Sequence, residues 1–434
     1  MTGLIVATVI TRLEGGAGAL ALRGALALDR SVVRPLIITG SSGGRLHTEA
    51  AQAGIEVIVA PCLKPVLTPR SDVQAVRWLR GLLTARRPDV VHTHCAKGGA
   101  IGRIAARQAG IARIVHTYHG FPFHEFQSPL RRRAYVVAER RLGRLTDVGL
   151  CTGTGVAVEA VRRRLIPPER VRTIGVTVDQ AQARRGRAAD RGARARARAA
   201  LGIPASARVV GAVGRLTYQK APEEFVTAIA ALPPGVTGVW VGGGELAGSV
   251  ARQVAASGHR VVLTGDRSDV ADLLPAFDVF ALPSRYEGLP TAIAEAMVCG
   301  VPVAATAVNA VADLVEPGVT GLLVPPGHPA AMASAIRYLL GEPAEAARMA
   351  AAARDRVGAR YSQEALAEAL EAAYQQSPGI PERSQASFPA VAGDDQAGSG
   401  DPRVGAAPAA AAPGDVRRLN SQSKAERAGG QGPA

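Results

Sequence analysis

Two cations stand close together after an expected strand in the second half of the chain. The run Gly211-Ala-Val-Gly-Arg-Leu216 ends a β-branched stretch, and Lys220 follows five residues after Arg215. Arginine offers a rigid fork of donors and lysine offers a mobile point charge, so the two could clamp a diphosphate. Two unrelated surface cations would give the same pattern, and the pair alone does not separate these interpretations.

Two glutamates that lie eight residues apart form a stronger signal. Glu287 lies in a loop after an expected strand at 279–282, and Glu295 lies inside the next helix. Pro290 suits the first turn of that helix, where no amide hydrogen is needed. Glu295 is five residues further on, about 7.5 Å along the helix axis. That distance is comparable to the separation between a sugar and the ribose of its nucleotide, and the apolar neighbours of Glu295 argue against a solvated helix face.

The loop between these acids could also bind an anion through its backbone. Gly288 permits a close approach of the main chain. The amides around this stretch, those of Leu289 and Thr291 on either side of Pro290, would point toward an anion at the start of the helix. The sequence therefore predicts a phosphate-binding helix start with an acid on each side.

These residues carry a resemblance to a known family. The E-x₇-E spacing, followed by Cys299-Gly-Val-Pro-Val303, resembles the family-four (group one) retaining glycosyltransferases with the GT-B fold. The stretch Glu316-Pro-Gly-Val-Thr-Gly-Leu-Leu-Val-Pro-Pro326 resembles the segment after the acidic motif in that family. The resemblance covers about residues 4–375.

Two further segments of the second half resemble that family. Residues 214–220 resemble its phosphate clamp, and Val241-Gly-Gly-Gly-Glu-Leu246 resembles its strand-to-helix turn beside the nucleotide. Gly243 and Glu245 are therefore expected to contact the donor. The resemblance implies that Glu287 holds sugar hydroxyls and that Glu295 accepts hydrogen bonds from the ribose. It also implies retention of the anomeric configuration during transfer from a nucleotide diphosphate-sugar to a hydroxyl acceptor.

The first half of the chain resembles the family less closely. Leu13-Glu-Gly-Gly-Ala-Gly18 resembles the family's glycine loop, so Gly15 and Gly16 should approach the donor diphosphate. His119 opens His119-Gly-Phe-Pro-Phe-His124 and resembles the histidine that contacts the transferred sugar. The glycines depart from G-x-G-x-x-G, and no acidic residue closes a second strand, which argues against a dinucleotide oxidoreductase.

Five histidines in the first half also permit a metal hypothesis: His92, His94, His116, His119 and His124. The first two have the spacing of a ligand pair, but no carboxylate cluster accompanies them and no Asp-x-Asp motif ends a strand. Histidines at strand ends that face a cleft explain the pattern better. Fixed cations make Mg²⁺ unnecessary for the leaving diphosphate, so we expect no metal and no cofactor, with the nucleotide sugar as a substrate.

The elements that must position these residues alternate between strand and helix. We expect strands at 4–10, 32–38, 55–59, 89–92, 113–117, 148–151 and 171–174, and again at 209–213, 236–241, 261–263, 279–282 and 301–304. Alanine-rich helices lie between them, for example at 71–86 and 130–145, and others close the chain at 330–340, 344–360 and 363–374. This alternation predicts an α/β fold of two Rossmann-like domains (GT-B), which face each other across a cleft.

We place the expected domain boundaries where this alternation of strands and helices stops. They give an acceptor-binding domain at 1–178, a basic linker at 179–207, a nucleotide-sugar-binding domain at 208–362, a C-terminal helix at 363–376 and a disordered tail at 377–434. The block Arg184–Arg198 holds seven arginines against one aspartate, and we interpret it as a solvated connector because blocks of like charge are usually disordered. The tail has no hydrophobic period.

Composition excludes several classes of function. The net charge of +15 would suit nucleic acid, but the arginine block supplies much of it and no aromatic residue is interleaved there. The four cysteines are scattered without a C-x-x-C pair, as in a reducing compartment. No leader precedes the first strand, and no apolar run reaches about 18 residues. We expect a cytoplasmic protein with no nucleic-acid partner and at most peripheral membrane contact.

The acceptor is the partner that the sequence determines least. Lys97-Gly-Gly99 could contact the donor or the acceptor, or Lys97 could be a surface lysine. The loop at 122–133 and the stretch at 62–70 are candidates for acceptor contacts, although no motif supports them. The first half lacks an obvious basic amphipathic helix with bulky apolar residues, which favours a soluble acceptor such as an aminoglycoside-type cyclitol in antibiotic biosynthesis. The alternatives are assembly of lipid-linked cell-surface or exopolysaccharide, a nucleotide-sugar 2-epimerase, and a basic nucleic-acid binder.

Overall fold

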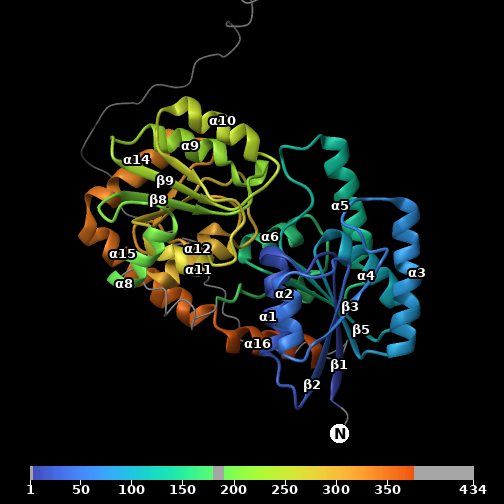
Figure 1. Cartoon of the computed structure of the whole chain (residues 1–434). Helices are drawn as coiled ribbons and strands as arrows, with labels where there is room; N and C mark the ends of the chain where they lie inside the picture. The colour runs from blue at the N-terminus through green and yellow to red at the C-terminus, as the bar shows by residue number, and fades with distance from the viewer. Residues whose placement is uncertain (1–2, 179–189, 376–434) are drawn as a thin grey trace, which may run out of the picture. The chain divides into compact units, whose positions relative to one another are not determined.

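The chain forms two separate sheets in which every strand runs parallel to its neighbours (Figure 1). This computed structural model describes residues 3–178 and 190–375. The first sheet has the strand order β3-β2-β1-β4-β5-β6-β7, and the second has the order β10-β9-β8-β11-β12-β13. In each sheet the order reverses beside the first strand of the set, which is the doubly wound arrangement that the sequence predicts.

The strands of the first sheet are β1 (Leu4–Ile10), β2 (Val33–Thr39), β3 (Glu56–Val59), β4 (Val90–His94), β5 (Arg113–Tyr118), β6 (Val148–Cys151) and β7 (Val171–Thr173). Those of the second are β8 (Arg208–Val213), β9 (Val236–Val241), β10 (Val261–Leu263), β11 (Val279–Leu282), β12 (Val303–Thr306) and β13 (Leu322–Val324). All twelve expected strands agree with the observed ones within two residues at each end, and β13 was not predicted.

The helices of the first half are α1 (Gly15–Ala27), α2 (Arg45–Gln52), α3 (Pro69–Arg86), α4 (Ala96–Gln108), α5 (Pro129–Gly143), α6 (Thr154–Arg162) and η1 (Pro168–Arg170). Those later in the chain are α8 (Arg191–Ala200), η2 (Tyr218–Lys220), α9 (Pro222–Ala230), α10 (Ala247–Ser257), α11 (Val270–Leu273), η3 (Leu274–Ala276), α12 (Thr291–Cys299), α13 (Val311–Leu314), α14 (Pro329–Gly341), α15 (Pro343–Arg360) and α16 (Gln363–Gln375).

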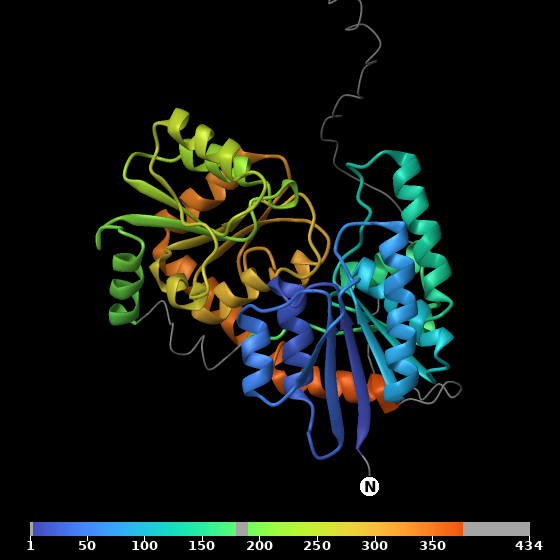
Figure 2. The same cartoon turned by 45° about the vertical axis from the view of Figure 1, so that its right-hand side comes forward.

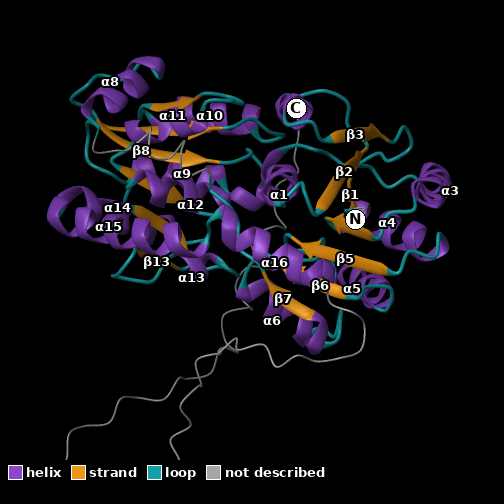
Figure 3. Cartoon of the chain, turned by 90° about the horizontal axis from the view of Figure 1, so that it is seen from below, coloured by secondary structure: helices purple, strands orange, loops and turns teal. Residues whose placement is uncertain are grey.

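Helices cover both faces of each sheet (Figure 3). In the second sheet, Val239 and Val241 of β9 pack with α12 and α15 on one face, while Trp240 between them packs against Phe225 of α9 on the other. Alternate residues of a strand point to opposite faces, so a strand covered on both sides must be apolar throughout. This explains the continuous valine-rich runs of the sequence.

The last described helix, α16, returns to the first sheet. Leu366, Leu370 and Tyr374 lie buried in one cluster with Val6 of β1 and Leu20 of α1. Figure 2 shows the orange-red α16 beside the blue α1. The first half of the fold is therefore completed by residues from the C-terminal end of the described chain.

The interpretation of the arginine block as a solvated connector is wrong for its described part. Asp190 caps helix α8 by accepting hydrogen bonds from the first-turn amides, and the helix packs on the second sheet's α11 and η3. Arg198 is 2% exposed and pairs with Asp278 at 3.0 Å, and Arg194 binds the same carboxylate. Like charges are tolerated here because one partly buried acid is shared between two of them. Residues 179–189 and the predicted tail at 377–434 lie outside the described residues.

Candidate active site

The carboxylate of Glu287 lies at the centre of a network of donors from two strand-end loops. Lys220 Nζ is 2.5 Å from Glu287 Oε1, Ser284 donates to the same oxygen over 2.6 Å, and Gln219 donates to Oε2 over 3.3 Å. The side chain of Glu287 is only 4% exposed and that of Lys220 is 17% exposed. A carboxylate so far removed from water requires charged and hydrogen-bonded partners. The structure thus brings together two residues predicted from sequence, and the lysine charge is engaged by the glutamate.

Arg285 joins the two loops that carry this pair. Its backbone N–H donates to Gln219 O over 2.8 Å, and its side chain donates to Tyr218 O over 2.8 Å. Its guanidinium lies 4.3 Å from the centre of the Tyr218 ring and pairs with Glu224 at 3.1 Å and with Glu223. These contacts fix η2 against the loop between β11 and α12.

Tyr286 is the residue around which the other predicted charges gather. Burial raises the pKa of its hydroxyl, Glu287 and Glu245 raise the pKa further, and Arg215 lowers it. Arg215 and Glu245 are exposed, and within 3–178 and 190–375 the Arg215 side chain has no hydrogen bond or ion pair. The charge of Arg215 is therefore available to a ligand. Tyr286 was not predicted from the sequence, although its position directly before Glu287 was a usable signal.

The glycine turn after β9 packs on the loop after β8 through the main chain. Gly242 and Gly244 have φ values of 132° and 153°. A Cβ on these two residues would lie 2.3 and 2.4 Å from carbonyl oxygens of the neighbouring loop. Gly243, which was expected to contact the donor, donates its backbone N–H to Asp266 over 2.8 Å.

Two helix N-termini meet beside this network. Helices α1 and α12 both lack a side-chain cap and an acidic residue in the first turn. The first begins at Gly15 and the second at Thr291, directly after Pro290. A Cβ on Gly16 would lie 3.5 Å from Thr291 Oγ1. The unpaired amides and the positive ends of both helix dipoles thus gather at one place, which favours an anion.

The backbone around Gly288 touches the histidine loop of the first half. A Cβ on Gly288 would lie 1.9 Å from His119 O, so glycine is required for this contact. Leu289 is buried in the core of the second sheet. Glu295 is partly buried on α12. Burial raises the pKa of the nearby Cys299 thiol, and the charge of Glu295 raises that pKa further. Tyr286 also stacks on His124 with ring centres 4.6 Å apart.

The histidines at the ends of β4 and β5 form a buried, hydrogen-bonded cluster. His94 Nδ1 lies 2.9 Å from His119 Nε2, and His92 bonds Tyr374 at 2.8 Å and Thr117 at 2.7 Å. Burial lowers the pKa of His92 to about 3 and that of His119 to about 4. The hydrogen bonds to Tyr374 and Thr117 occupy both ring nitrogens of His92, which leaves no lone pair for a metal. No group of three or more metal-ligating side chains occurs within the described ranges.

Lys97, a sequence candidate for substrate contact, holds the neighbouring loop instead. Its Nζ pairs with Asp72 of α3 at 2.6 Å and also donates to Val66 O. The stretch at 62–70, another candidate for acceptor contacts, is thereby fixed to the start of α4.

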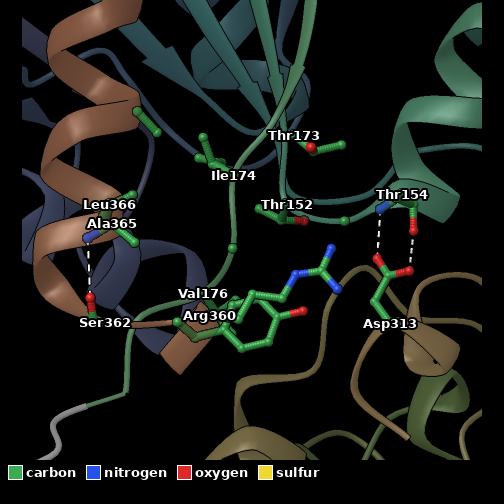
Figure 4. A pocket seen from close by; sticks show the side chains of 14 residues that line it. Thr152, Thr154, Thr173, Ile174, Val176, Asp313, Arg360, Ser362, Ala365 and Leu366 are labelled. Atoms are coloured by element: carbon green, nitrogen blue, oxygen red, sulfur yellow. Dashed lines mark hydrogen bonds between the residues drawn. The ribbon is translucent and has the colours of Figure 1, made fainter. Parts of the chain in front are cut away.

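A pocket of about 210 Å³ lies apart from these residues, where the chain leaves the first sheet and where it returns to it (Figure 4). Its lining includes Thr152, Ile174, Arg360 and Ser362, and none of the predicted site residues. At its edge Asp313 accepts a 2.6 Å hydrogen bond from the backbone N–H of Thr154 (Figure 4).

Comparison with known proteins identifies the family. Residues 207–342 match a family model described as glycosyl transferases group 1, and residues 15–177 match a glycosyl transferase 4-like domain. The chain is 30% identical over 289 residues to the Escherichia coli UDP-Gal:alpha-D-GlcNAc-diphosphoundecaprenol alpha-1,3-galactosyltransferase, which covers 64% of this chain and 73% of that relative. The chain belongs to the group 1 glycosyltransferases. This glycosyltransferase is also 29% identical over 327 residues to the D-inositol 3-phosphate glycosyltransferase of Xylanimonas cellulosilytica, which covers 70% of this chain and 78% of that relative.

Solved structures confirm the predicted GT-B fold of this glycosyltransferase. Anabaena HepE in complex with UDP and glucose aligns with a TM-score of 0.75 at 22% identity, over 85% of this chain and 98% of that one. WaaG, a glycosyltransferase involved in lipopolysaccharide biosynthesis, aligns with a TM-score of 0.70 at 17% identity, over 86% of this chain and 100% of that one. Along 3–178 and 190–375, no helix combines the length and the hydropathy that a membrane span needs.

Lowering the pH from 7 to 5 should reduce the free energy of unfolding of this glycosyltransferase. Below about pH 6.5 the unfolded chain takes up protons on His92, His94, His116 and His119, while burial keeps the native imidazoles neutral. Above that pH the side chains are neutral in both states and contribute no slope. Each histidine adds up to about 1.4 kcal/mol per pH unit, measured by denaturant unfolding at pH 7, 6 and 5.

The variant His92→Asn should reduce the dependence of the unfolding free energy on pH by the contribution of one histidine, up to about 1.4 kcal/mol per pH unit. The matched control is His328→Asn, which changes an exposed histidine of the second half. Equal slopes for His92→Asn and the wild type would show that the buried cluster does not stay neutral.

Proposed function

We propose that this glycosyltransferase moves a sugar from a nucleotide diphosphate-sugar to a hydroxyl acceptor, with retention of the anomeric configuration. The observation that carries the proposal is the ion pair between Lys220 and Glu287, which lies beside the start of α12. Support also comes from the solved structure of HepE, which holds UDP and glucose in the same fold. A cytoplasmic location belongs to the proposal, because all four cysteines are free.

The residues around this ion pair suit a leaving diphosphate. Negative charge builds on the diphosphate as its oxygen separates from the anomeric carbon, and fixed donors aimed at that charge lower the barrier. Arg215 supplies an unengaged cation, and the starts of α1 and α12 supply amides. Lys220 would bind the phosphate from its place beside Glu287, whose carboxylate keeps Ser284 and Gln219 as donors.

The sugar would lie between Glu287 and His119. Glu287 would accept hydrogen bonds from sugar hydroxyls, and the neutral His119 would contact the sugar near the reacting carbon. The acceptor oxygen bonds to the anomeric carbon on the face that the diphosphate leaves, and its proton passes to the departing phosphate oxygen. Glu295 would hold the ribose. The family resemblance supports this front-face mechanism and the retention that it produces.

Helix α5 supports a lipid-linked acceptor at an anionic membrane. Leu130 is 80% exposed and Val137 is 36% exposed. The helix carries five arginines, and its one acid, Glu139, is buried against Arg103 at 3.0 Å. An exposed apolar and basic helix face is attracted to anionic lipids. The exposed Leu130 and Val137 among these arginines therefore weaken the reason for favouring a soluble acceptor.

The loop before α5 connects this helix to the candidate site. It runs from His119 through Phe126, which is 48% exposed and contacts Tyr218 with ring centres 5.7 Å apart. The Escherichia coli relative, which is named for a diphosphoundecaprenol-linked acceptor, supports the same acceptor class. A soluble cyclitol phosphate is the second candidate, because the Xylanimonas relative is named for an inositol phosphate.

Replacing Arg215 or Lys220 by alanine should lower kcat by about 100-fold or more, as for loss of other donors that stabilise an oxyanion. The measurement is transfer of labelled sugar at saturating donor. The control is Arg348→Ala, an exposed arginine that pairs with Glu345. Near-normal kcat in both site variants would remove the clamp from the mechanism, and nucleotide release that needs no acceptor would favour an epimerase.

We propose that the reaction needs no metal, because fixed cations and helix ends neutralise the leaving diphosphate. Activity should stay within about two-fold of its normal value after dialysis against EDTA, in keeping with electrostatic stabilisation by the protein itself. Loss of activity in EDTA, with recovery on addition of Mg²⁺, would refute metal independence.

Vesicles that contain anionic phospholipid should bind the enzyme, and Leu130→Glu should weaken binding by about 10-fold or more because it places a charge in the apolar face. Sedimentation with vesicles of phosphatidylglycerol and phosphatidylcholine measures this. Val319→Glu, at an exposed apolar site of the second half, is the matched control. Absence of binding, together with full activity on a water-soluble cyclitol phosphate, would favour the second acceptor.

A further inference from the structure

Helix α6 of the first half is capped by a carboxylate from the second half. Asp313 Oδ2 accepts a 2.6 Å hydrogen bond from the Thr154 backbone N–H, and Asp313 Oδ1 accepts one from the Thr154 hydroxyl. The first amides of a helix have no partner within it, and its N-terminus attracts negative charge. Helix α6 has no side-chain cap from Gly153, the residue before it, and no acid in its first turn. Asp313 therefore supplies from another part of the chain what the local sequence lacks.

Two glycines allow the main chains to approach closely at this contact. A Cβ on Gly155 would lie 2.7 Å from the carbonyl carbon of Asn309, and one on Gly153 would lie 2.6 Å from Ala310 Cβ. Any side chain at either position would push the segment at 309–313 away from α6. The hydrogen bonds of Asp313 and this close packing thus act on the same five residues.

The same segment also holds Glu287. Asn309 Oδ1 accepts a 3.0 Å hydrogen bond from the backbone N–H of Glu287. Asn309 itself has a φ of 44°, in the left-handed region that asparagine tolerates better than most residues. A displacement of the segment at 309–313 would therefore move the acid whose side chain binds Lys220.

We propose that Asp313 and Asn309 are positioning residues, which set Glu287 in register with the first half of the enzyme through Thr154. The proposal rests on the proposed function, in which Glu287 binds the sugar while the first half supplies His119 and the acceptor. Correct transfer needs the two halves aligned to within fractions of an ångström, since small misplacements of reacting groups have large effects on rate.

Comparing the Kd of the nucleotide with kcat distinguishes a positioning role from a general structural role. Most nucleotide contacts should come from the second half, through Arg215, Glu295 and the start of α12, while the first half adds only the start of α1. Loss of the Thr154–Asp313 contact should therefore reduce transfer much more than nucleotide affinity. Thr154→Val removes the hydroxyl donor with little change of shape, and Asp313→Ala removes the carboxylate. We expect kcat to fall about 10-fold or more in each, while the Kd of UDP or GDP, whichever binds the wild type more tightly by calorimetry, stays within about two-fold.

Conservative variants complete the test. Thr154→Ser keeps the hydroxyl and should restore most of kcat. Asn309→Asp keeps an acceptor for the Glu287 amide, whereas Asn309→Gly keeps the left-handed backbone but removes the acceptor, so only the glycine variant should lose activity. Glu345→Gln, on the exposed face of α15, is the control for an acid outside this contact.

Two results would overturn the proposal. One is a kcat within two-fold of normal for both Thr154→Val and Asp313→Ala. The other is a loss of nucleotide affinity as large as the loss of kcat, which would indicate general damage to the second half. A wild-type enzyme that binds neither UDP nor GDP and transfers no sugar would instead refute the proposed function, and this inference with it.

Discussion

A carboxylate withheld from water, that of Glu287, is the constraint on which the rest of the site depends. Its charge is compensated by Lys220, Ser284 and Gln219, and its backbone is held by Asn309. These partners come from the loops after β8, β11 and β12, three adjacent strands of one sheet. A parallel sheet places the carboxyl ends of its strands along one edge, so the burial of one acid keeps three loops in register.

Neutralising the lysine with the glutamate also determines the electrostatic character of the site. The ion pair carries no net charge, so the positive potential comes from Arg215 and from the uncapped starts of α1 and α12. The backbone amides at these two helix starts are fixed in place before any ligand arrives. Such preorganised groups stabilise developing charge without the reorganisation that water would require.

The sequence predicted the elements well and the contacts between distant elements poorly. Strand β1, the bounds of β9 and β11 and the helix start at Pro290 result from local patterns of apolar residues and proline, which act over a few neighbouring positions. The buried Arg198 was missed because its partner, Asp278, is 80 residues away. Tyr286 and Asn309 were missed for the same reason, since their importance lies in the groups that the folded chain places against them.

The return of α16 to the first sheet has a consequence for biosynthesis. Leu366, Leu370 and Tyr374 fill the face of β1, β4 and β5 beside α1, and Arg113 donates two hydrogen bonds to Ala373 O. While the ribosome is still translating the second sheet, this face of the first stays open to solvent and to chaperones. The N-terminal half can thus finish folding only after the second half has been made, because helix α16 is the last described part of the chain to be synthesised.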